Sequence, residues 1–325
     1  MSATDVHAVD LAPDGWLLER TSAGPRPVPA NRLDEHFAEE LAPPAWATDL
    51  LVYVHGWQTK PDSACAAVRR LLELTATRYA PDRYPNLKPW RPWTVVVRWP
   101  SRSLPSLGGY RRIRDRAHAM STAGHAARVI GRLLGYLDTR RADPGAASVL
   151  ANRDGQYLHL LGHSFGCRLL CEAVQWAADG PDTLGWSTPE PPGRPFTVDS
   201  MLLLQMAAPR DAFAAMFTTL GEAPLRGPVV ATYSQHDRAT GFWHLRAEKR
   251  AGIGYAGIGT APAPVSAIRM LPVEEPYPLA VLDHRFVSVD ASDVFVRGHG
   301  PAGAHSDHVR PESAHLLLSL ADHSR

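Results

Sequence analysis

The sequence predicts an α/β fold, with a mostly parallel, twisted sheet and helices on both faces. Short apolar runs rich in β-branched residues recur along the chain, which is typical of strands buried on both faces. Helical patterns separate these runs, and a repeated strand–helix–strand order produces a parallel sheet. The 325 residues, 45% of them hydrophobic, allow one large domain or two ordinary ones and exclude general disorder.

Six apolar runs are the predicted strands. They lie at residues 50–54, 94–99, 157–161, 201–206, 229–233 and 286–289. The N-terminal segment 1–48 is poorly readable, and only Trp16 to Arg20 within it suggests an early strand.

Helices are expected between the strands. Asp62 or Ser63 can cap the first helix, with Pro61 just before it, and Pro311 suits the first position of the last helix. The predicted helices are 62–74, 112–138, 166–178, 211–220 and 311–320.

Two interruptions are rich in proline and glycine. Residues 179–198 read as an irregular loop, and 241–285 form a long insertion, much of it non-helical. Loops this long inside a compact domain are usually functional. Because no linker or internal repeat is visible, we expect a single domain over residues 1–325.

Composition excludes several classes of protein. The net charge is +1 and the arginines are interspersed with acids, so we expect no nucleic-acid partner. Three cysteines cannot build a disulfide scaffold, and no apolar run is long enough for a transmembrane span. The first ten residues do not resemble a signal peptide, which favours a cytoplasmic location.

Residues 162–166 match the pattern Gly-x-Ser-x-Gly, with Ser164 at its centre. The pattern alone is weak evidence, and an ordinary turn serine is the alternative. Here, however, an apolar strand runs directly in and a helical pattern runs directly out. That is the sharp strand-to-helix turn which exposes a nucleophilic serine at the positive end of a helix. Ser164 is therefore the predicted nucleophile.

A serine nucleophile needs a base, and the base needs an acid that fixes its tautomer. In folds with this turn the order is serine, acid, histidine. Asp237 follows the strand at 229–233 and is the preferred acid, with Asp211 as the alternative. The base should lie between the last strand and the last helix, where His305 is the first choice and His308 the second.

The same C-terminal region suggests a rival metal site. Four histidines are close together in sequence, and histidine is the commonest metal ligand: His299, His305, His308 and His315. Their spacing matches no standard zinc pattern, so a bound metal is not the favoured interpretation.

Backbone amides are expected to form an oxyanion hole. One amide should come from Phe165, directly after the nucleophile, and the other from Trp57, in the loop after the strand at 50–54. Gly56 lets the backbone of this loop approach closely.

Together these segments resemble the α/β-hydrolase superfamily, and in particular a bacterial branch of unassigned function. The resemblance spans about residues 50 to 310. It is carried by His55-Gly56-Trp57, Arg98-Trp99-Pro100-Ser101, Gly162 to Gly166, Ala207 to Asp211, Tyr233 to Ala239, Arg250-Ala251-Gly252 and His305-Ser306.

The resemblance implies an α/β-hydrolase fold and a Ser164–Asp237–His305 triad that hydrolyses or transfers an acyl group without a cofactor. The stretch 207–228 is too short for a large cap domain. Any lid is expected to come from 102–111, 179–198 or 241–285.

Three functional hypotheses remain open. The leading one is a serine hydrolase that cleaves a carboxylic ester or thioester of a small-molecule acyl substrate. The same triad also suits an acyltransferase or cyclase, a lactonase or an amidase, and an apolar wall of Trp57, Trp99, Phe165, Phe242 and Trp243 would favour acyl transfer. The third is a non-catalytic, hydrolase-like binding protein. The oligomeric state is not readable from the sequence.

Overall fold

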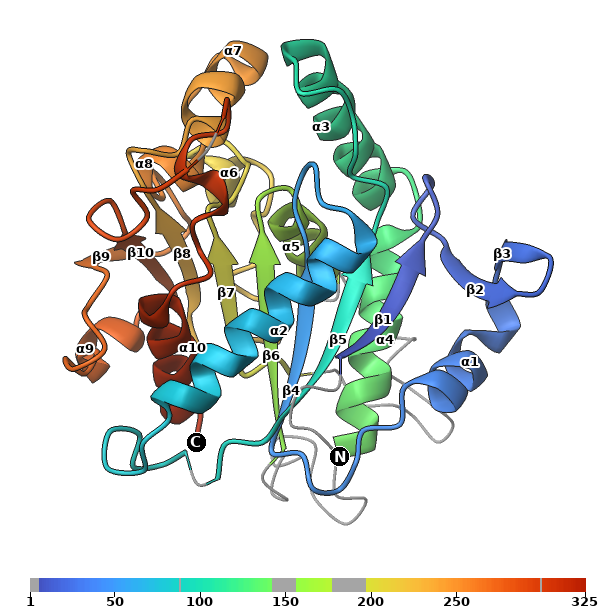
Figure 1. Ribbon diagram of the computed structural model, residues 1–325, viewed down its shortest axis with the longest axis horizontal. Helices are drawn as coiled ribbons and strands as arrows, with labels where there is room; N and C mark the ends of the chain where they lie inside the picture. Colours follow the sequence, from blue (N-terminus) through green and yellow to red (C-terminus); the bar gives the residue numbers. More distant parts are fainter. Residues whose placement is uncertain (1–5, 88, 142–155, 177–196, 299) are drawn as a thin grey trace.

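The computed structural model describes residues 6–87, 89–141, 156–176, 197–298 and 300–325. Its centre is a mostly parallel ten-stranded sheet in the order β3-β2-β1-β5-β4-β6-β7-β8-β10-β9 (Figure 1). Among these strands, only the pairs β1–β2 and β2–β3 are antiparallel. The strands of the described residues are β1 Val6–Leu11, β2 Leu17–Thr21, β3 Gly24–Pro27, β4 Asp49–Val54, β5 Pro92–Arg98, β6 Tyr157–His163, β7 Ser200–Leu204, β8 Val229–Tyr233, β9 Val265–Arg269 and β10 Phe286–Asp290.

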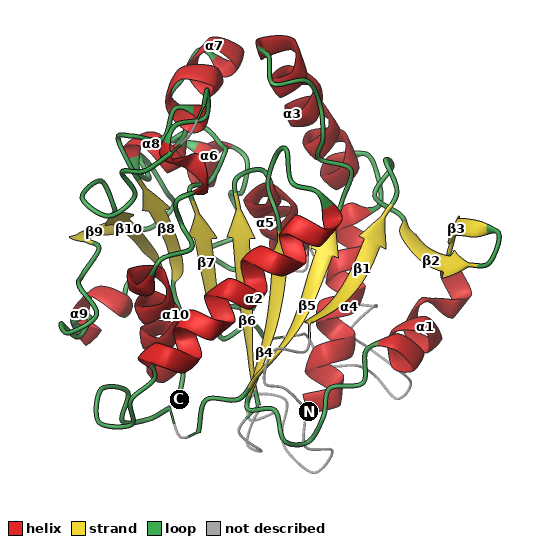
Figure 2. Cartoon of the chain, in the orientation of Figure 1, coloured by secondary structure: helices red, strands yellow, loops and turns green. Residues whose placement is uncertain are grey.

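Helices cover both faces of the sheet (Figure 2). Helices α2 and α10 cross one face, whereas α4 and α5 cover the other. The α-helices are α1 Leu33–Glu40, α2 Pro61–Arg78, α3 Leu107–Thr122, α4 Ala126–Arg141, α5 Gly166–Trp176, α6 Ala212–Ala215, α7 His244–Glu248, α8 Ile253–Ala256, α9 Leu279–Leu282 and α10 Pro311–His323.

Two apolar cores result from the alternation of side chains along the buried strands. In β4, Leu50, Val52 and Val54 point into one core, and Leu51 and Tyr53 point into the other. The first core also contains the apolar residues of α4 and α5, and the second those of α2 and α10. The predicted α/β class with a parallel sheet is therefore confirmed.

The strand order reverses direction at β4. The chain passes from β4 to its neighbour β5 on one side and then returns to β6 on the other side of β4. Right-handed crossovers in opposite directions place α2 and α4 on opposite faces of the sheet. The chain thus leaves β4 and β6 toward helices on opposite faces, and the carboxyl ends of two such neighbouring strands are where sites in open α/β sheets are built.

The single helix predicted over 112–138 is wrong, because the structure has α3 and α4 with a break between them. At the break Gly124 N–H donates to Ala119 O over 2.7 Å, and His125 N–H donates to Asp14 O over 2.9 Å. The turn between β1 and β2 packs tightly here, since a Cβ on Gly15 would lie 2.4 Å from Ala126 N. This contact between segments distant in sequence interrupts the helix. The apolar periodicity of residues 112–138 does not reveal the break.

Other element boundaries also differ from the prediction. The helix expected at 211–220 is reduced to α6, because Thr218, Thr219 and Gly221 are poor helix formers. Helix α2 begins at Pro61 itself, and its N-cap residue Lys60 makes no side-chain cap, so neither expected cap is used.

Three strands were missed. Strands β1 and β3 lie in the segment that the sequence left poorly readable, and β9 lies within the insertion 241–285. The insertion also contains α7, α8 and α9. Most of the predicted loop 179–198 lies outside the described residues. Within the described part of the chain, no helix has the length and apolarity that crossing a membrane requires.

A buried ion cluster joins the C-terminal end of α4 to the sheet. The guanidinium of Arg141 donates to Asp138 Oδ1 over 2.8 Å and also pairs with Asp199. It donates further to the carbonyls of Gln156 and Thr197. The side chains of all three charged residues are at most 4% exposed. Without this cation Asp138 would lose its ion pair, whereas Asp199 would keep Arg226 Nη1 at 3.4 Å from its Oδ1.

We expect Arg141→Ala to lower the free energy of unfolding by about 3–5 kcal/mol, the usual cost of an uncompensated buried charge. Urea unfolding followed by circular dichroism would measure it. The matched control is Arg140→Ala at the neighbouring, exposed position, with an expected change below about 1 kcal/mol. Equal effects of the two substitutions would contradict this assignment.

Candidate active site

Ser164 lies in the turn between β6 and α5, at the carboxyl edge of the sheet. Its φ angle is 56°, which is unusual for a residue with a side chain. Its amide donates to Leu204 O over 3.0 Å, and its carbonyl accepts from Ala207 N over 3.2 Å. The neighbouring strand β7 thus holds the strained conformation in place.

Three glycines make this turn sterically feasible. A Cβ on Gly162 would lie 2.9 Å from Cys167 Cα, and one on Gly166 would lie 2.2 Å from Val54 O. A Cβ on Gly56 would lie 2.5 Å from Ser164 Cβ. A side chain on Gly56 or Gly166 would push the turn away from β4 and the loop that follows it, and one on Gly162 would clash within the turn itself.

Asp237 and His305 meet Ser164 in one hydrogen-bonded chain. His305 Nε2 lies 2.7 Å from Ser164 Oγ, and His305 Nδ1 lies 2.8 Å from Asp237 Oδ2. A carboxylate only accepts, so Nδ1 carries the proton and Nε2 is left to accept from the serine hydroxyl. Ser164, Asp237 and His305 are 1%, 0% and 3% exposed, respectively. Their contacts are therefore shielded from bulk water.

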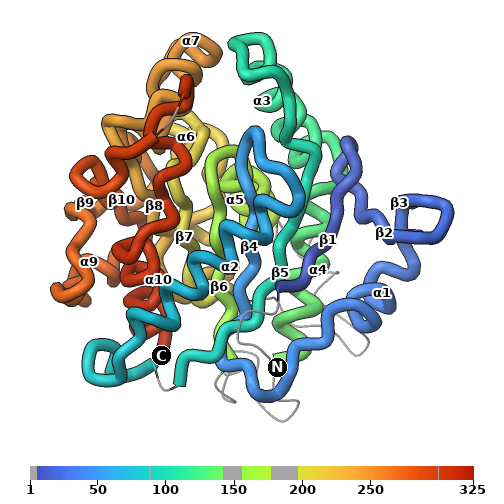
Figure 3. Tube along the Cα trace, in the orientation of Figure 1, coloured from blue at the N-terminus to red at the C-terminus, as the bar shows by residue number. Residues whose placement is uncertain are grey.

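Backbone hydrogen bonds join the loops that carry the acid and the histidine. Arg238 N–H donates to Ala302 O over 3.1 Å, and Ala304 N–H donates to His236 O over 3.0 Å. Gly303 lies between these bonds with φ of 60°, and a Cβ there would lie 2.5 Å from His236 O. The segment after β10 runs up beside α7 before it descends into α10, which brings these loops together (Figure 3).

Two further groups hold Asp237. Thr240 N–H donates to Oδ1 over 3.0 Å, and the side-chain amide of Gln205 donates to Oδ2 over 3.2 Å. The same Gln205 amide donates to Ala304 O over 3.0 Å. Sequence reasoning missed Gln205, although a polar residue at the carboxyl end of an apolar strand was a usable signal.

The amides of Trp57 and Phe165 flank the serine from two loops. Within the described residues, neither amide donates to a protein acceptor. Both residues are buried, at 7% and 0% exposure. Buried donors without an acceptor are uncommon, and they are what an oxyanion hole requires.

His55 shapes the loop that presents the Trp57 amide. Its Nε2 accepts from Trp99 N over 3.2 Å, and its Nδ1 donates to Gly56 O over 3.0 Å. Trp99 Nε1 donates back to His55 O over 2.7 Å. Burial lowers the pKa of His55 to about 4, so it remains neutral near pH 7 and keeps this tautomer.

His308, the second-choice base, does not contact Ser164. Its ring lies against His163, with ring centroids 4.0 Å apart. His163 in turn donates from Nε2 to His305 O over 2.8 Å, so it supports the backbone of the histidine that does reach Ser164. Burial, with the charges of His308 and His305, lowers the pKa of His163 well below its usual value.

Asp211 and His315 make their contacts away from Ser164. Asp211, the second-choice acid, pairs with Arg250 at a partly exposed site. His315 Nδ1 lies 2.7 Å from Tyr84 Oη, and its Nε2 lies 2.8 Å from Glu275 O. His299 lies outside the described residues. Among the residues that are described, no three His, Cys, Asp or Glu side chains are grouped to hold a metal ion.

Helices α3 and α7 meet beside the serine turn. Tyr110 Oη lies 3.0 Å from His244 Nδ1, and Arg114 donates to Ala247 O over 2.9 Å. Tyr110 also packs edge-on against Trp57 and contacts Phe165. Two of the three segments expected to supply a lid, 102–111 and 241–285, are thus in contact.

The predicted apolar wall is only partly assembled. Trp57, Trp99 and Phe165 are buried, and Trp243 is partly exposed. Phe242 is 47% exposed, so it does not line an enclosed site. The buried aromatic surface is formed mainly by Trp57, Tyr110 and Phe165.

The arrangement combines a hydroxyl, an oriented imidazole, a buried carboxylate and two unpaired amides. These groups are the ones required to transfer a proton from the hydroxyl and to stabilise an oxyanion. No family model matches the chain, and no curated protein or solved structure was found to be similar to it.

The buried His308 should make stability depend on pH. Burial, with the charge of His305, lowers its pKa to about 3, whereas an unfolded histidine titrates near 6.5. Between these values the unfolded chain binds a proton that the folded chain does not bind. The free energy of unfolding should therefore fall as the pH decreases below about 6.5, by up to about 1.4 kcal/mol per pH unit for this group.

Urea unfolding at pH 5, 6 and 7 would measure this contribution. His308→Gln should reduce the pH slope, whereas His284→Gln, at an exposed histidine, should leave it unchanged. An unaltered slope in His308→Gln would refute the assignment.

Proposed function

We propose that the protein is a serine hydrolase of the α/β-hydrolase superfamily that cleaves a carboxylic ester or thioester. The observation that carries the proposal is the hydrogen-bonded chain Ser164–His305–Asp237, with contacts of 2.7 and 2.8 Å. The left-handed serine turn at the carboxyl end of a parallel sheet supports it further.

Each group has a role in acyl transfer. His305 Nε2 takes the Ser164 hydroxyl proton as Oγ attacks the carbonyl carbon, and it returns that proton to the leaving group. The amides of Trp57 and Phe165 bind the oxyanion. Asp237 keeps His305 in the required tautomer and stabilises the imidazolium. Water, activated by His305, then cleaves the acyl-enzyme and regenerates Ser164.

Acyl transfer to an alcohol or amine is the second candidate function. The specific observation in its favour is that Ser164 is only 1% exposed and adjoins the aromatic cluster of Trp57, Tyr110 and Phe165. A site that excludes water allows another nucleophile to accept the acyl group. Product analysis with added alcohols and amines would distinguish transfer from hydrolysis.

We expect Ser164→Ala to abolish reaction with a fluorophosphonate probe and to lower kcat on p-nitrophenyl esters by about 10⁴-fold or more. The melting temperature should change little, because the substitution removes only the hydroxyl and its hydrogen bond to His305. Ser63→Ala, at an exposed serine of α2, should keep full labelling and turnover. Labelling of wild type at any serine other than Ser164, or activity retained in Ser164→Ala, would remove Ser164 from the mechanism.

Asp237→Asn should lower kcat by about 10²–10⁴-fold, because an amide no longer selects the tautomer that accepts at Nε2. Asp211→Asn is the matched control and should leave kcat within about twofold. Both would be measured by ester hydrolysis between pH 6 and 9. Loss of activity in Asp211→Asn alone would instead assign the acid to Asp211.

A further inference from the structure

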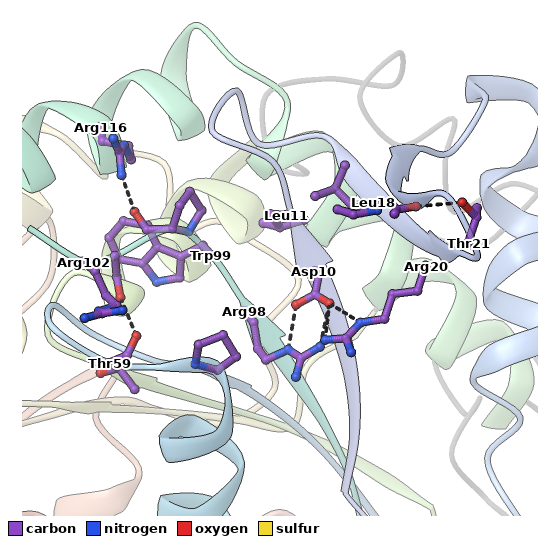
Figure 4. A pocket seen from close by; sticks show the side chains of 15 residues that line it. Asp10, Leu11, Leu18, Arg20, Thr21, Thr59, Arg98, Trp99, Arg102 and Arg116 are labelled. Carbon is purple, nitrogen blue, oxygen red and sulfur yellow. Dashed lines mark hydrogen bonds and ion pairs between the residues drawn. The ribbon is translucent and has the colours of Figure 1, made fainter.

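A cavity lies two strands away from the strand that leads into Ser164. It has a volume of about 620 Å³ and opens between the β1–β3 ribbon, the loop after β5 and the start of α2. This volume is in the usual range of small-molecule sites. Figure 4 shows Arg102, Arg116 and Trp99 on one side of it and Asp10 with Arg20 on the other.

Four arginines and one carboxylate line this cavity: Arg20, Arg98, Arg102 and Arg116, with Asp10. Asp10 is already bound by two of the arginines. It accepts from Arg98 over 2.6 and 2.7 Å and from Arg20 over 3.2 Å. The formal charge of these five side chains is +3, in a chain whose net charge is only +1.

The other two arginines have no carboxylate partner among the described residues. Arg116 donates to the neutral carbonyl of Pro100 over 2.6 Å. Arg102 forms no ion pair or hydrogen bond to the described part of the chain and is exposed. Both guanidinium groups therefore retain donors for an anion. The N-terminal end of α2 at Pro61 adds a partial positive charge at the same cavity.

The rest of the lining is largely apolar. Leu11 and Leu18 come from the β1–β2 ribbon, Pro25 from β3, and Trp99 and Pro100 from the loop after β5. An inorganic ion would leave these surfaces exposed to water. A ligand with an apolar body and one anionic group would use both kinds of surface.

This cavity is separate from Ser164. Strand β4 lies between β5, which bounds the cavity, and β6, which carries the serine. At the usual strand spacing this places the two strands about 10 Å apart. Trp99, which lines the cavity, stacks on the ring of His55 in the loop after β4, with ring centroids 5.9 Å apart.

We propose that this cavity is a second binding site, for an organic anion with an apolar body, in which Arg102 and Arg116 bind the anionic group. The proposal does not depend on the hydrolase activity, because it concerns residues outside the Ser164 chain.

Isothermal titration calorimetry of the full chain would test it with octanoate and octyl phosphate as probes, and with octanol and inorganic phosphate as controls. We expect at least one octyl anion to bind with 1:1 stoichiometry and both controls to bind at least tenfold more weakly. Binding of octanoate would identify a carboxylate ligand, and binding of octyl phosphate alone a phosphate ligand. Absence of binding by both octyl anions, or equal binding of octanol, would overturn the proposal.

Matched variants locate the site. Arg102→Gln and Arg116→Gln should each weaken binding about tenfold, the usual effect of one charge-assisted hydrogen bond. Arg112→Gln, at an exposed arginine outside the cavity lining, should leave binding unchanged, and so should Ser164→Ala. Equal effects of Arg102→Gln and Arg112→Gln, or loss of binding in Ser164→Ala alone, would refute this location.

Discussion

The close approach of two backbone turns governs the structure around Ser164. The loop after β4 and the turn after β6 touch where Gly56 and Gly166 leave no space for a Cβ. This contact holds Ser164 at a φ of 56°, a conformation that costs of order 1–3 kcal/mol for a residue with a side chain. Packing of the two buried cores against β4 and β6 offsets that cost. The same contact places Gly56, which directly precedes Trp57, against Ser164.

Burial then determines how the polar groups behave. Asp237 is fully buried, but three donors reach its two oxygens, from His305, Thr240 and Gln205. The histidines behind the site, His163 and His308, are kept neutral because burial lowers the pKa of each and so disfavours its charged form. A positive charge on His305 would therefore face the carboxylate of Asp237 and would meet no second positive charge on the rings of His163 and His308. Of the three histidines, only His305 is hydrogen-bonded to Ser164 among the described contacts.

The sheet topology also explains why the buried Ser164 chain and the arginine-lined cavity lie near the same edge of the sheet. The reversal at β4 places the loops of β5 and β6 on either side of a single strand. The β6 side gathers buried residues of near-zero exposure, whereas the β5 side meets the β1–β3 ribbon and is lined by arginines. These arginines come from distant parts of the sequence. They are brought together because β1 pairs with β5. In this pairing Asp10 lies opposite Arg98.

The sequence by itself determined the α/β class, the six central strands and the position of Ser164, because these depend on local periodicity and on glycines within a few residues of one another. It also named Asp237 and His305, on the strength of their order along the chain. Only the tertiary structure decided that His305 rather than His308 reaches Ser164, since both fit the same gap and their choice depends on the bonds around Gly303. The break between α3 and α4, the edge strand β9 and the arginine-lined cavity were likewise beyond the sequence. Each arises from contacts between segments distant along the chain, whose meeting is fixed by sheet order and not by any local pattern.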